Sequence, residues 1–267
     1  MKIIIAGTCA LESREGLRKT VQILKKLKIN YLRASLWKPR TRPGWSGMGY
    51  GFLPLLLEET ALNGIIPATE VGSSGQAQET ADYLKEQENA PEVILWLGSR
   101  NQNHDEQQAI ARILKDCPTV TLMVKNQMWE DENHWLGIVE HVLSTGFPEE
   151  RLWLCHRGFA PAREGNPALF RNVPNFEMAM WIKEQTNLKV ILDPSHIGGC
   201  REKVFWILRE SFDYDFDGYM IETHDDPEKA LTDKSQQLTP NEIEEAVNLI
   251  RESEKGEVSR VRKRRQI

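Results

Sequence analysis

The sequence contains few cysteines, and nothing in their spacing pairs them. Cys9, Cys117, Cys155 and Cys200 are the only four, and no two of them form a CxxC motif. Thiols scattered in this way fit a reduced cytosolic protein better than a disulfide framework. The glycine-rich turns that cradle nucleotide phosphates are also missing, because neither GxGxxG nor GxxxxGKS occurs. These absences argue against a disulfide-stabilised scaffold and against a nucleotide-binding function.

Long apolar runs and a positive net charge are absent as well. No apolar stretch approaches the roughly 18 residues of a transmembrane helix. The opening stretch from Lys2 to Gly7 lacks the apolar region and cleavage site of a signal peptide. A formal net charge of -5 argues against a nucleic-acid-binding surface spread over the whole domain. We therefore expect a soluble, cytoplasmic protein that binds neither membranes nor nucleic acid.

What the sequence does contain is a repeated alternation of short apolar runs with longer amphipathic stretches. There are eight such pairs in 267 residues, and parallel strands covered by helices have this apolar, β-branched composition. The pattern predicts an α/β protein, a closed (β/α)8 TIM barrel over residues 1–252. An open doubly wound sheet is the alternative, but such a fold would be expected to contain a glycine-rich phosphate-binding turn, which this sequence lacks. The predicted strands are residues 2–8, 30–36, 65–70, 92–97, 119–125, 151–155, 188–192 and 217–222.

Two helix starts can be recognised from their first residues. Asp105 precedes Glu106, and Thr239-Pro240 precedes a further apolar-periodic run. Residues 253–267 are basic and follow the last predicted helix. We interpret them as a solvated tail, with the start of a further, truncated helical segment as the alternative.

Polar residues concentrate where the predicted strands end. In a (β/α)8 barrel the active site forms at the C-terminal ends of the strands, so these residues should converge on one mouth. They are Cys9, Arg33, Lys38, Arg40, Glu70, Arg100, Lys125, Arg157, His196 and Glu222.

One subset has the chemistry of a metal site. Cys9, His196, Glu222 and, in the last loop, Asp233 offer a thiolate, an imidazole and two carboxylates. Such a set suits one divalent ion such as Mn, Fe, Co or Zn, acting as a Lewis acid on a carbonyl group. The alternative is structural: a buried apolar cysteine, a core histidine and two hydrogen-bond acceptors.

A second subset is cationic and comprises Lys38, Arg40, Arg100, Lys125 and Arg157. Several such side chains in one barrel mouth indicate a strongly anionic small substrate. Neighbouring carboxylates could instead neutralise them in structural ion pairs.

Nine short strings follow one another along the chain. They begin at Gly7 (GTCALES), Lys38 (KPRTRP), Thr69 (TEV), Leu97 (LGSRN), Val124 (VK), Cys155 (CHRG), Asp193 (DPSH), Ile221 (IETH) and Ala230 (ALTD). In this order they resemble the serial motifs of the 3-deoxy-D-arabino-heptulosonate 7-phosphate (DAHP) synthase family, class I. The resemblance lies in the subgroup shared with 3-deoxy-octulosonate-8-phosphate synthase, and it runs from Ile3 to about Pro240.

The resemblance implies a (β/α)8 barrel with metal ligands at Cys9, His196, Glu222 and Asp233. It also implies that Arg100, Lys125 and Arg157 hold phosphoenolpyruvate, with Lys38 near its reacting end and Arg33 close by. Arg40 and Thr41 would hold the phosphate of erythrose 4-phosphate, and we add Glu70 to the substrate-binding set. We assign catalytic roles to Lys38, His196 and Cys9, with proton transfer at Lys38.

The activity implied is the condensation of phosphoenolpyruvate with erythrose 4-phosphate, the first step of the shikimate pathway of aromatic amino acid biosynthesis. Alternatives are the octulosonate synthase, which uses arabinose 5-phosphate, a class II aldolase, and a non-catalytic sugar-phosphate sensor. By analogy with the family, we expect a homodimer or homotetramer. The basic tail faintly resembles the opening of a chorismate mutase helix, so a chorismate mutase domain or partner is a further expectation. Two departures from the family pattern are Thr8, where proline is usual, and His156, where many members have glutamate and where it changes the charge beside Arg157.

Overall fold

The computed structural model describes residues 1–39, 44–161 and 169–256. Eight strands pair in parallel in chain order, and β1 pairs with both β2 and β8, which closes the barrel. The predicted (β/α)8 fold is confirmed, and each predicted strand contains or overlaps an observed one. The strands are β1 Ile3–Gly7, β2 Tyr31–Arg33, β3 Ile66–Glu70, β4 Val93–Leu97, β5 Val120–Lys125, β6 Leu152–His156, β7 Lys189–Leu192 and β8 Gly218–Glu222.

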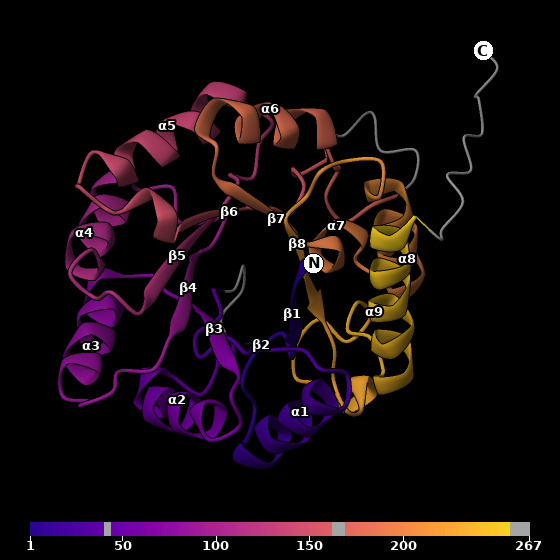
Figure 1. Cartoon of the computed structure of the whole chain (residues 1–267), viewed down its shortest axis with the longest axis horizontal. Helices are drawn as coiled ribbons and strands as arrows, with labels where there is room; N and C mark the ends of the chain where they lie inside the picture. Colours follow the sequence, from indigo (N-terminus) through magenta and orange to yellow (C-terminus); the bar gives the residue numbers. More distant parts are fainter. Residues whose placement is uncertain (40–43, 162–168, 257–267) are drawn as a thin grey trace.

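Helices surround this barrel as an outer ring (Figure 1). Eight longer helices of the described chain form the ring, and the short α7 is an addition after β7. The ring consists of α1 Arg14–Lys26, α2 Leu53–Ala61, α3 Ser74–Lys85, α4 His104–Leu114, α5 Glu132–Leu143, α6 Phe176–Thr186, α8 Arg201–Ser211 and α9 Pro240–Lys255. The short elements are α7 Pro194–Gly198 and the 3-10 turns η1 Tyr50–Phe52, η2 Glu149–Arg151 and η3 Pro227–Lys229.

Two separate apolar layers hold the barrel together, and β4 shows how one strand serves both. Ile94 and Trp96 belong to the cluster inside the barrel, whereas Val93, Leu95 and Leu97 belong to the layer between strands and helices. Successive side chains of a strand point to opposite faces, so one apolar run can supply both layers. This explains why the predicted strands were almost continuously apolar.

The two predicted helix starts had different outcomes. Thr239 begins α9 with a capping box, accepting from the backbone N–H of Glu242, as predicted. The start at Asp105 was wrong, because Asn103 caps α4 and accepts from the N–H groups of Asp105 and Glu106. The side chain of Asn103 reaches N–H groups two and three residues later, which is the usual geometry of an N-cap.

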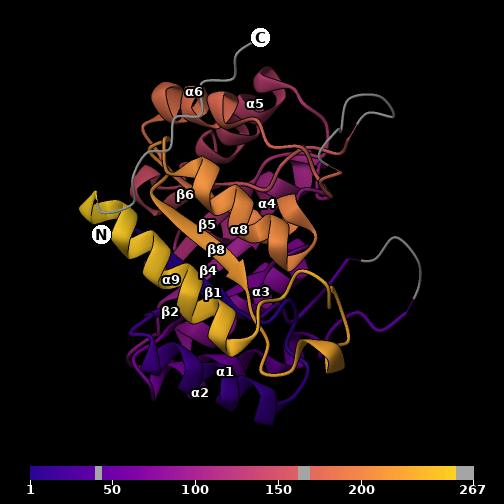
Figure 2. The same ribbon diagram turned by 90° about the vertical axis from the view of Figure 1, so that its right-hand side faces the viewer.

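The last helix, α9, crosses the outside of the barrel beside α8 (Figure 2). It runs to Lys255 and ends at Gly256, which adopts a left-handed conformation. Residues 253–255 of the predicted tail therefore belong to the helix, and residues 257–267 lie outside the described residues. Among the described residues, no helix combines the length and apolar character needed to span a bilayer.

Candidate active site

Strand alternation delivers charged side chains to the C-terminal mouth of the barrel. In β5, Met123 packs inside the barrel, so Lys125, two residues later, also points inward at the end of the strand. In β8 the same relation joins Met220 to Glu222. Most predicted site residues meet around one cavity of about 90 Å³. Its lining includes Cys9, Arg33, Lys38, Glu70, Arg100, Lys125, Arg157, His196 and Asp233.

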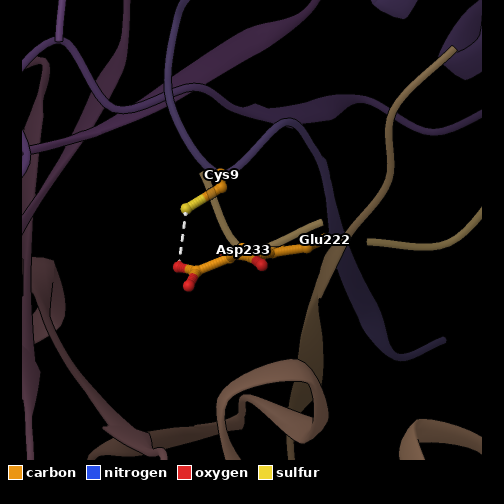
Figure 3. A group of neighbouring side chains, drawn as sticks. All are labelled: Cys9, Glu222 and Asp233. Carbon is orange, nitrogen blue, oxygen red and sulfur yellow. Dashed lines mark hydrogen bonds between the residues drawn. The ribbon is translucent and has the colours of Figure 1, made fainter. Parts of the chain in front are cut away.

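Three of the four predicted metal ligands form a compact group at this mouth. Potential ligand atoms of Cys9, Glu222 and Asp233 lie within 4.8 Å of one another (Figure 3). The Sγ atom of Cys9 is 3.2 Å from Oδ2 of Asp233. Oε1 of the fully buried Glu222 makes no regular hydrogen bond, and Nη2 of Arg33 lies 2.9 Å from it as an ion-pair partner. A thiol and two carboxylates in one compact group fit a divalent cation.

The fourth predicted ligand, His196, lies next to this group rather than within it. Its Nε2 atom is 3.7 Å from Oε1 of Glu222. Its Nδ1 atom is 2.8 Å from Oδ2 of Asp193, which also caps α7 by accepting from the backbone N–H of His196. Burial lowers the pKa of His196, which favours a neutral ring. With its proton on Nδ1 and donated to Asp193, the ring presents the Nε2 lone pair toward Glu222.

The sequence analysis assigned no role to Asp193, although this residue is the first of the DPSH motif. An Asp-Pro pair three residues before a histidine is a helix-start signal, and here it orients that histidine. Burial opposes ionisation of Asp193, but His196 and Lys125 together hold its pKa well below the usual range. Nζ of Lys125 lies 2.8 Å from Oδ2 of Asp193.

The structure divides the predicted cations into paired and unpaired ones. Arg33, buried inside the barrel, has Nη2 2.9 Å from Oε1 of Glu222. Burial would raise the pKa of Glu222, but Arg33 and His196 outweigh burial and lower it. Lys38 contacts both Cys9 Sγ and Asp233 Oδ2. Within the predicted cationic subset, Lys38 and Lys125 thus have carboxylate partners, as the ion-pair alternative expected.

Arg157 and Arg100 have no carboxylate partner among the described residues. Nη1 of Arg157 donates to Oδ1 of Asn172 at 2.7 Å, and burial lowers the pKa of Arg157 to about 10. Nη1 of Arg100 donates to the backbone oxygen of Pro39 at 3.3 Å. Guanidinium groups without a carboxylate in a cavity are suited to an anionic ligand.

Lys38 neutralises part of the negative charge around Cys9. Burial disfavours its ammonium form, but Cys9, Glu222 and Asp233 outweigh burial and raise the pKa of Lys38. Burial, followed by Glu222, raises the pKa of the Cys9 thiol. Lys38 lowers the pKa of this thiol by less than burial and Glu222 raise it, so a further cation beside the sulfur would favour the thiolate.

Trp96 is a further site residue that sequence reasoning missed. Its ring lies 5.3 Å from the guanidinium carbon of Arg33 and 5.3 Å from Nζ of Lys125. It also donates a side-chain hydrogen bond to Glu70, whose pKa is raised by burial. A tryptophan within an apolar strand is usually a core residue. Only its inward-facing position near the C-terminal end of β4 could have indicated a role in the site.

The side chain of His156 lies outside the barrel mouth. His156 lies two residues after Leu154, on the face of β6 that packs against the helices. Its ring stacks on Trp135 of α5, with 5.7 Å between the ring centroids. Its Nε2 accepts from the backbone N–H of Asn175 at 3.1 Å, and burial lowers its pKa to about 3. The imidazole is therefore neutral at physiological pH, so His156 adds no charge beside Arg157, where a glutamate would add a negative one.

Two predicted substrate contacts and two unpredicted residues complete the site. Arg40 and Thr41 lie outside the described residues, so their assignment stays a prediction. Arg171, which was not predicted, has Nη1 2.9 Å from Oδ1 of Asp233. Gln236, also unpredicted, donates to Oε2 of Glu222 at 2.6 Å. Both residues are in loops, where no periodic pattern indicates the direction of a side chain.

The fold and this mouth together define a (β/α)8 barrel with a candidate divalent-metal centre beside a pocket lined by arginine and lysine side chains. The family model of the DAHP synthetase I family matches residues 1–257, and the chain belongs to that family.

Related proteins agree with this assignment. The chain is 28% identical over 238 residues to the phospho-2-dehydro-3-deoxyheptonate aldolase of Thermotoga maritima. That match covers 88% of the chain but only 64% of the length of this relative. A crystal structure of phospho-2-dehydro-3-deoxyheptonate aldolase (DAHP synthase) from T. maritima matches with a TM-score of 0.83 and 28% identity, covering 96% of this chain and 70% of that one. A truncated form of 3-deoxy-D-arabino-heptulosonate 7-phosphate synthase from T. maritima matches with a TM-score of 0.79 and 25% identity, covering 96% and 87%.

Proposed function

We propose that the chain condenses phosphoenolpyruvate with erythrose 4-phosphate and water, giving 3-deoxy-D-arabino-heptulosonate 7-phosphate and inorganic phosphate. The observation that carries this proposal is one cavity lined both by Cys9 and Asp233 of the ligand group and by Arg100 and Arg157, which have no carboxylate partner in the part of the chain that the structure describes. An electrophilic aldehyde and a multiply charged anion need these two kinds of environment side by side. Membership of the DAHP synthetase I family supports the same reaction.

Cys9, Glu222 and Asp233, with His196 adjacent, would hold one divalent metal ion. When bound, such an ion supplies a Lewis acid that polarises the aldehyde oxygen. The thiol and the two carboxylates gathered at one point of the mouth support this assignment. We include metal dependence in the proposal and leave the metal as Mn, Fe, Co or Zn.

The remaining chemistry belongs to the side chains of the chain itself. Arg100, Arg157 and Lys125 would bind the phosphate and carboxylate groups of phosphoenolpyruvate in a cavity where charge is poorly screened. C3 of phosphoenolpyruvate attacks the aldehyde carbon, water adds at C2, and phosphate leaves. Lys38, whose ammonium already faces Cys9 and Asp233, would donate a proton to the aldehyde oxygen as it gains charge.

The nearest alternative is the octulosonate synthase reaction with arabinose 5-phosphate. We favour the four-carbon aldehyde because Lys38-Pro39-Arg40-Thr41 resembles the segment of DAHP synthases that receives erythrose 4-phosphate. A cytoplasmic location, a homodimer or homotetramer and a chorismate mutase partner belong to the same proposal and derive from the family resemblance.

The test is release of inorganic phosphate from phosphoenolpyruvate with either aldehyde, in the presence of Mn²⁺ or of a chelator. Turnover with erythrose 4-phosphate that needs the metal and is lost in Cys9→Ala supports the proposal. Turnover with arabinose 5-phosphate alone would assign the octulosonate reaction. Turnover that persists in chelator would refute the metal, and no turnover with either aldehyde would favour a sugar-phosphate sensor.

A further inference from the structure

The loop before α9 contains two consecutive glutamines, Gln236 and Gln237, whose side chains are both fully buried. Burying an amide costs free energy unless its donors and acceptors are satisfied. Both amides find partners, and those partners are the candidate metal ligands or residues directly beside them. The same loop also supplies Asp233, which adopts a left-handed backbone conformation with φ +48°.

Gln236 connects the two candidate carboxylate ligands. Its Nε2 atom donates to Oε2 of Glu222 at 2.6 Å. Its Oε1 atom accepts from Nη1 of Arg171 at 2.6 Å, and the same Nη1 lies 2.9 Å from Oδ1 of Asp233. One amide and one guanidinium therefore form a continuous bridge from Glu222 to Asp233.

This bridge holds one oxygen of each carboxylate and turns the other toward the thiol or the imidazole. On Glu222, Oε2 is bound to Gln236, whereas Oε1 lies 2.9 Å from Nη2 of Arg33 and 3.7 Å from Nε2 of His196. On Asp233, Oδ1 is bound to Arg171, whereas Oδ2 contacts Nζ of Lys38 and lies 3.2 Å from Sγ of Cys9. The bonds to Gln236 and Arg171 keep the carboxylates from rotating, so the second oxygen of each stays directed at Cys9 or His196.

Gln237 performs a similar task for the cysteine. Its Oε1 atom accepts from the backbone N–H of Cys9 at 3.0 Å, and its Nε2 atom donates to the backbone oxygen of Thr232 at 2.8 Å. Thr232 directly precedes Asp233. Thr8, unlike a proline, leaves the backbone before Cys9 free to rotate, so the contact with Gln237 helps to hold the thiol in register with Asp233.

We propose that Gln236 and Gln237 are positioning residues that preorganise Cys9, Glu222 and Asp233 to bind a divalent transition metal, with Arg171 bracing Gln236. This inference rests on the proposed function, since it assumes that these three side chains are ligands. Partners that orient metal ligands in this way typically change metal affinity or activity by roughly 10- to 100-fold when mutated.

The test is Mn²⁺ binding to the chelator-treated full chain without substrates, followed by the paramagnetic resonance signal of free Mn²⁺. Gln236→Met and Gln237→Met keep the approximate shape of the side chain and remove the amide. Each should weaken Mn²⁺ binding by about 10- to 100-fold. The matched control is Gln107→Met, because Gln107 is equally buried in α4 and donates to the Asn101 backbone oxygen at 2.6 Å, outside the metal group. It should bind Mn²⁺ as the wild type does.

A second readout separates positioning from general damage. With Co²⁺, the thiolate-to-cobalt absorption per bound ion should fall in Gln237→Met and persist in Gln236→Met, because only Gln237 contacts Cys9. Arg171→Met gives an independent test if a glutamine variant does not fold, because the Arg171 side chain is 41% exposed. It should weaken Mn²⁺ binding several-fold, less than loss of Gln236 does.

If both glutamine variants fold and bind Mn²⁺ with wild-type affinity, the inference is overturned. If they do not fold, wild-type Mn²⁺ affinity in Arg171→Met overturns it. An equal loss in Gln107→Met would also overturn it, because the effect would then reflect stability. A wild type that binds Mn²⁺ but releases no phosphate would contradict the proposed reaction alone. A wild type that binds no divalent metal would overturn both proposals.

Discussion

Arg33 offers the sharpest test of how the mouth is held together. The substitution Arg33→Met removes a guanidinium that is 1% exposed and keeps an apolar side chain in the barrel interior. Arg33 lies 2.9 Å from Glu222 and 3.9 Å from Asp193, both fully buried carboxylates. Removing one partner of a buried ion pair leaves an uncompensated charge and costs about 3–5 kcal/mol. We expect a loss of that size in the free energy of unfolding at pH 7.

The pH dependence identifies the cause of this loss. In the wild type, Arg33 and His196 outweigh burial and depress the pKa of Glu222. The resulting stabilisation is present above the ordinary glutamate pKa of about 4.3 and disappears as the pH falls through the depressed value. Without Arg33, burial prevails and the pKa of Glu222 rises, so the variant should lose less stability near pH 4 than at pH 7.

The assay is urea unfolding of the chelator-treated protein at both pH values. Arg18→Met is the control, because Arg18 pairs with Glu59 at 3.0 Å but is 58% exposed, and it should cost no more than about 1 kcal/mol. Adding Glu222→Gln to Arg33→Met should recover part of the loss at pH 7. A loss in Arg33→Met no larger than in Arg18→Met, or one equal at both pH values, would refute the buried-charge argument.

Three further predictions concern single side chains. Burial lowers the pKa of His156 to about 3, so the wild type should lose stability as the pH falls from about 6.5 toward 3. The loss in the free energy of unfolding should be roughly 2 kcal/mol at pH 5. Urea unfolding of His156→Phe should lack this contribution to the pH dependence. Gly98→Ala would place a methyl group 2.1 Å from Oε1 of Glu70 and should cost about 1–3 kcal/mol, whereas Gly137→Ala, with nothing within 4 Å, should stabilise α5 by about 0.5–1 kcal/mol in the same assay. Mn²⁺ should raise the wild-type thermal unfolding midpoint, and Cys9→Ser should reduce that rise; an equal rise would exclude the thiol as a ligand.

The sequence predicted the barrel well because one physical signal repeats eight times. A strand such as β4 must supply apolar side chains to the barrel interior and to the helix layer, so its composition alone reveals it. The same regularity fixes where Lys125 and Glu222 point, since side chains two residues apart share a face. His156 shows the limit, because a shift of one residue sends a side chain out of the mouth and into the helix layer.

The loop residues could not be predicted in this way. Asp193 was recoverable, because capping chemistry links it to His196 three residues later. Gln236 and Arg171 were not, because no local rule brings residues 65 positions apart to 2.6 Å. Their contact depends on where Arg171, between β6 and α6, and Gln236, between β8 and α9, lie at the mouth, which is set by tertiary packing rather than by periodicity.

Pairing of charges divides the mouth into two parts with different chemistry. Arg33 and Lys38 lie against Glu222 and Asp233, so a cation entering beside Cys9 meets carboxylates that are already ionised and held in place. Arg157 instead contacts the neutral Asn172, and no carboxylate competes for its guanidinium among the described residues. Under the proposed function, an anionic substrate in this poorly solvated cavity would therefore be drawn toward Arg157, and its electrophilic partner toward the candidate metal group. The proposed condensation between two anions needs this separation, because their phosphates must be neutralised apart while their carbon atoms meet.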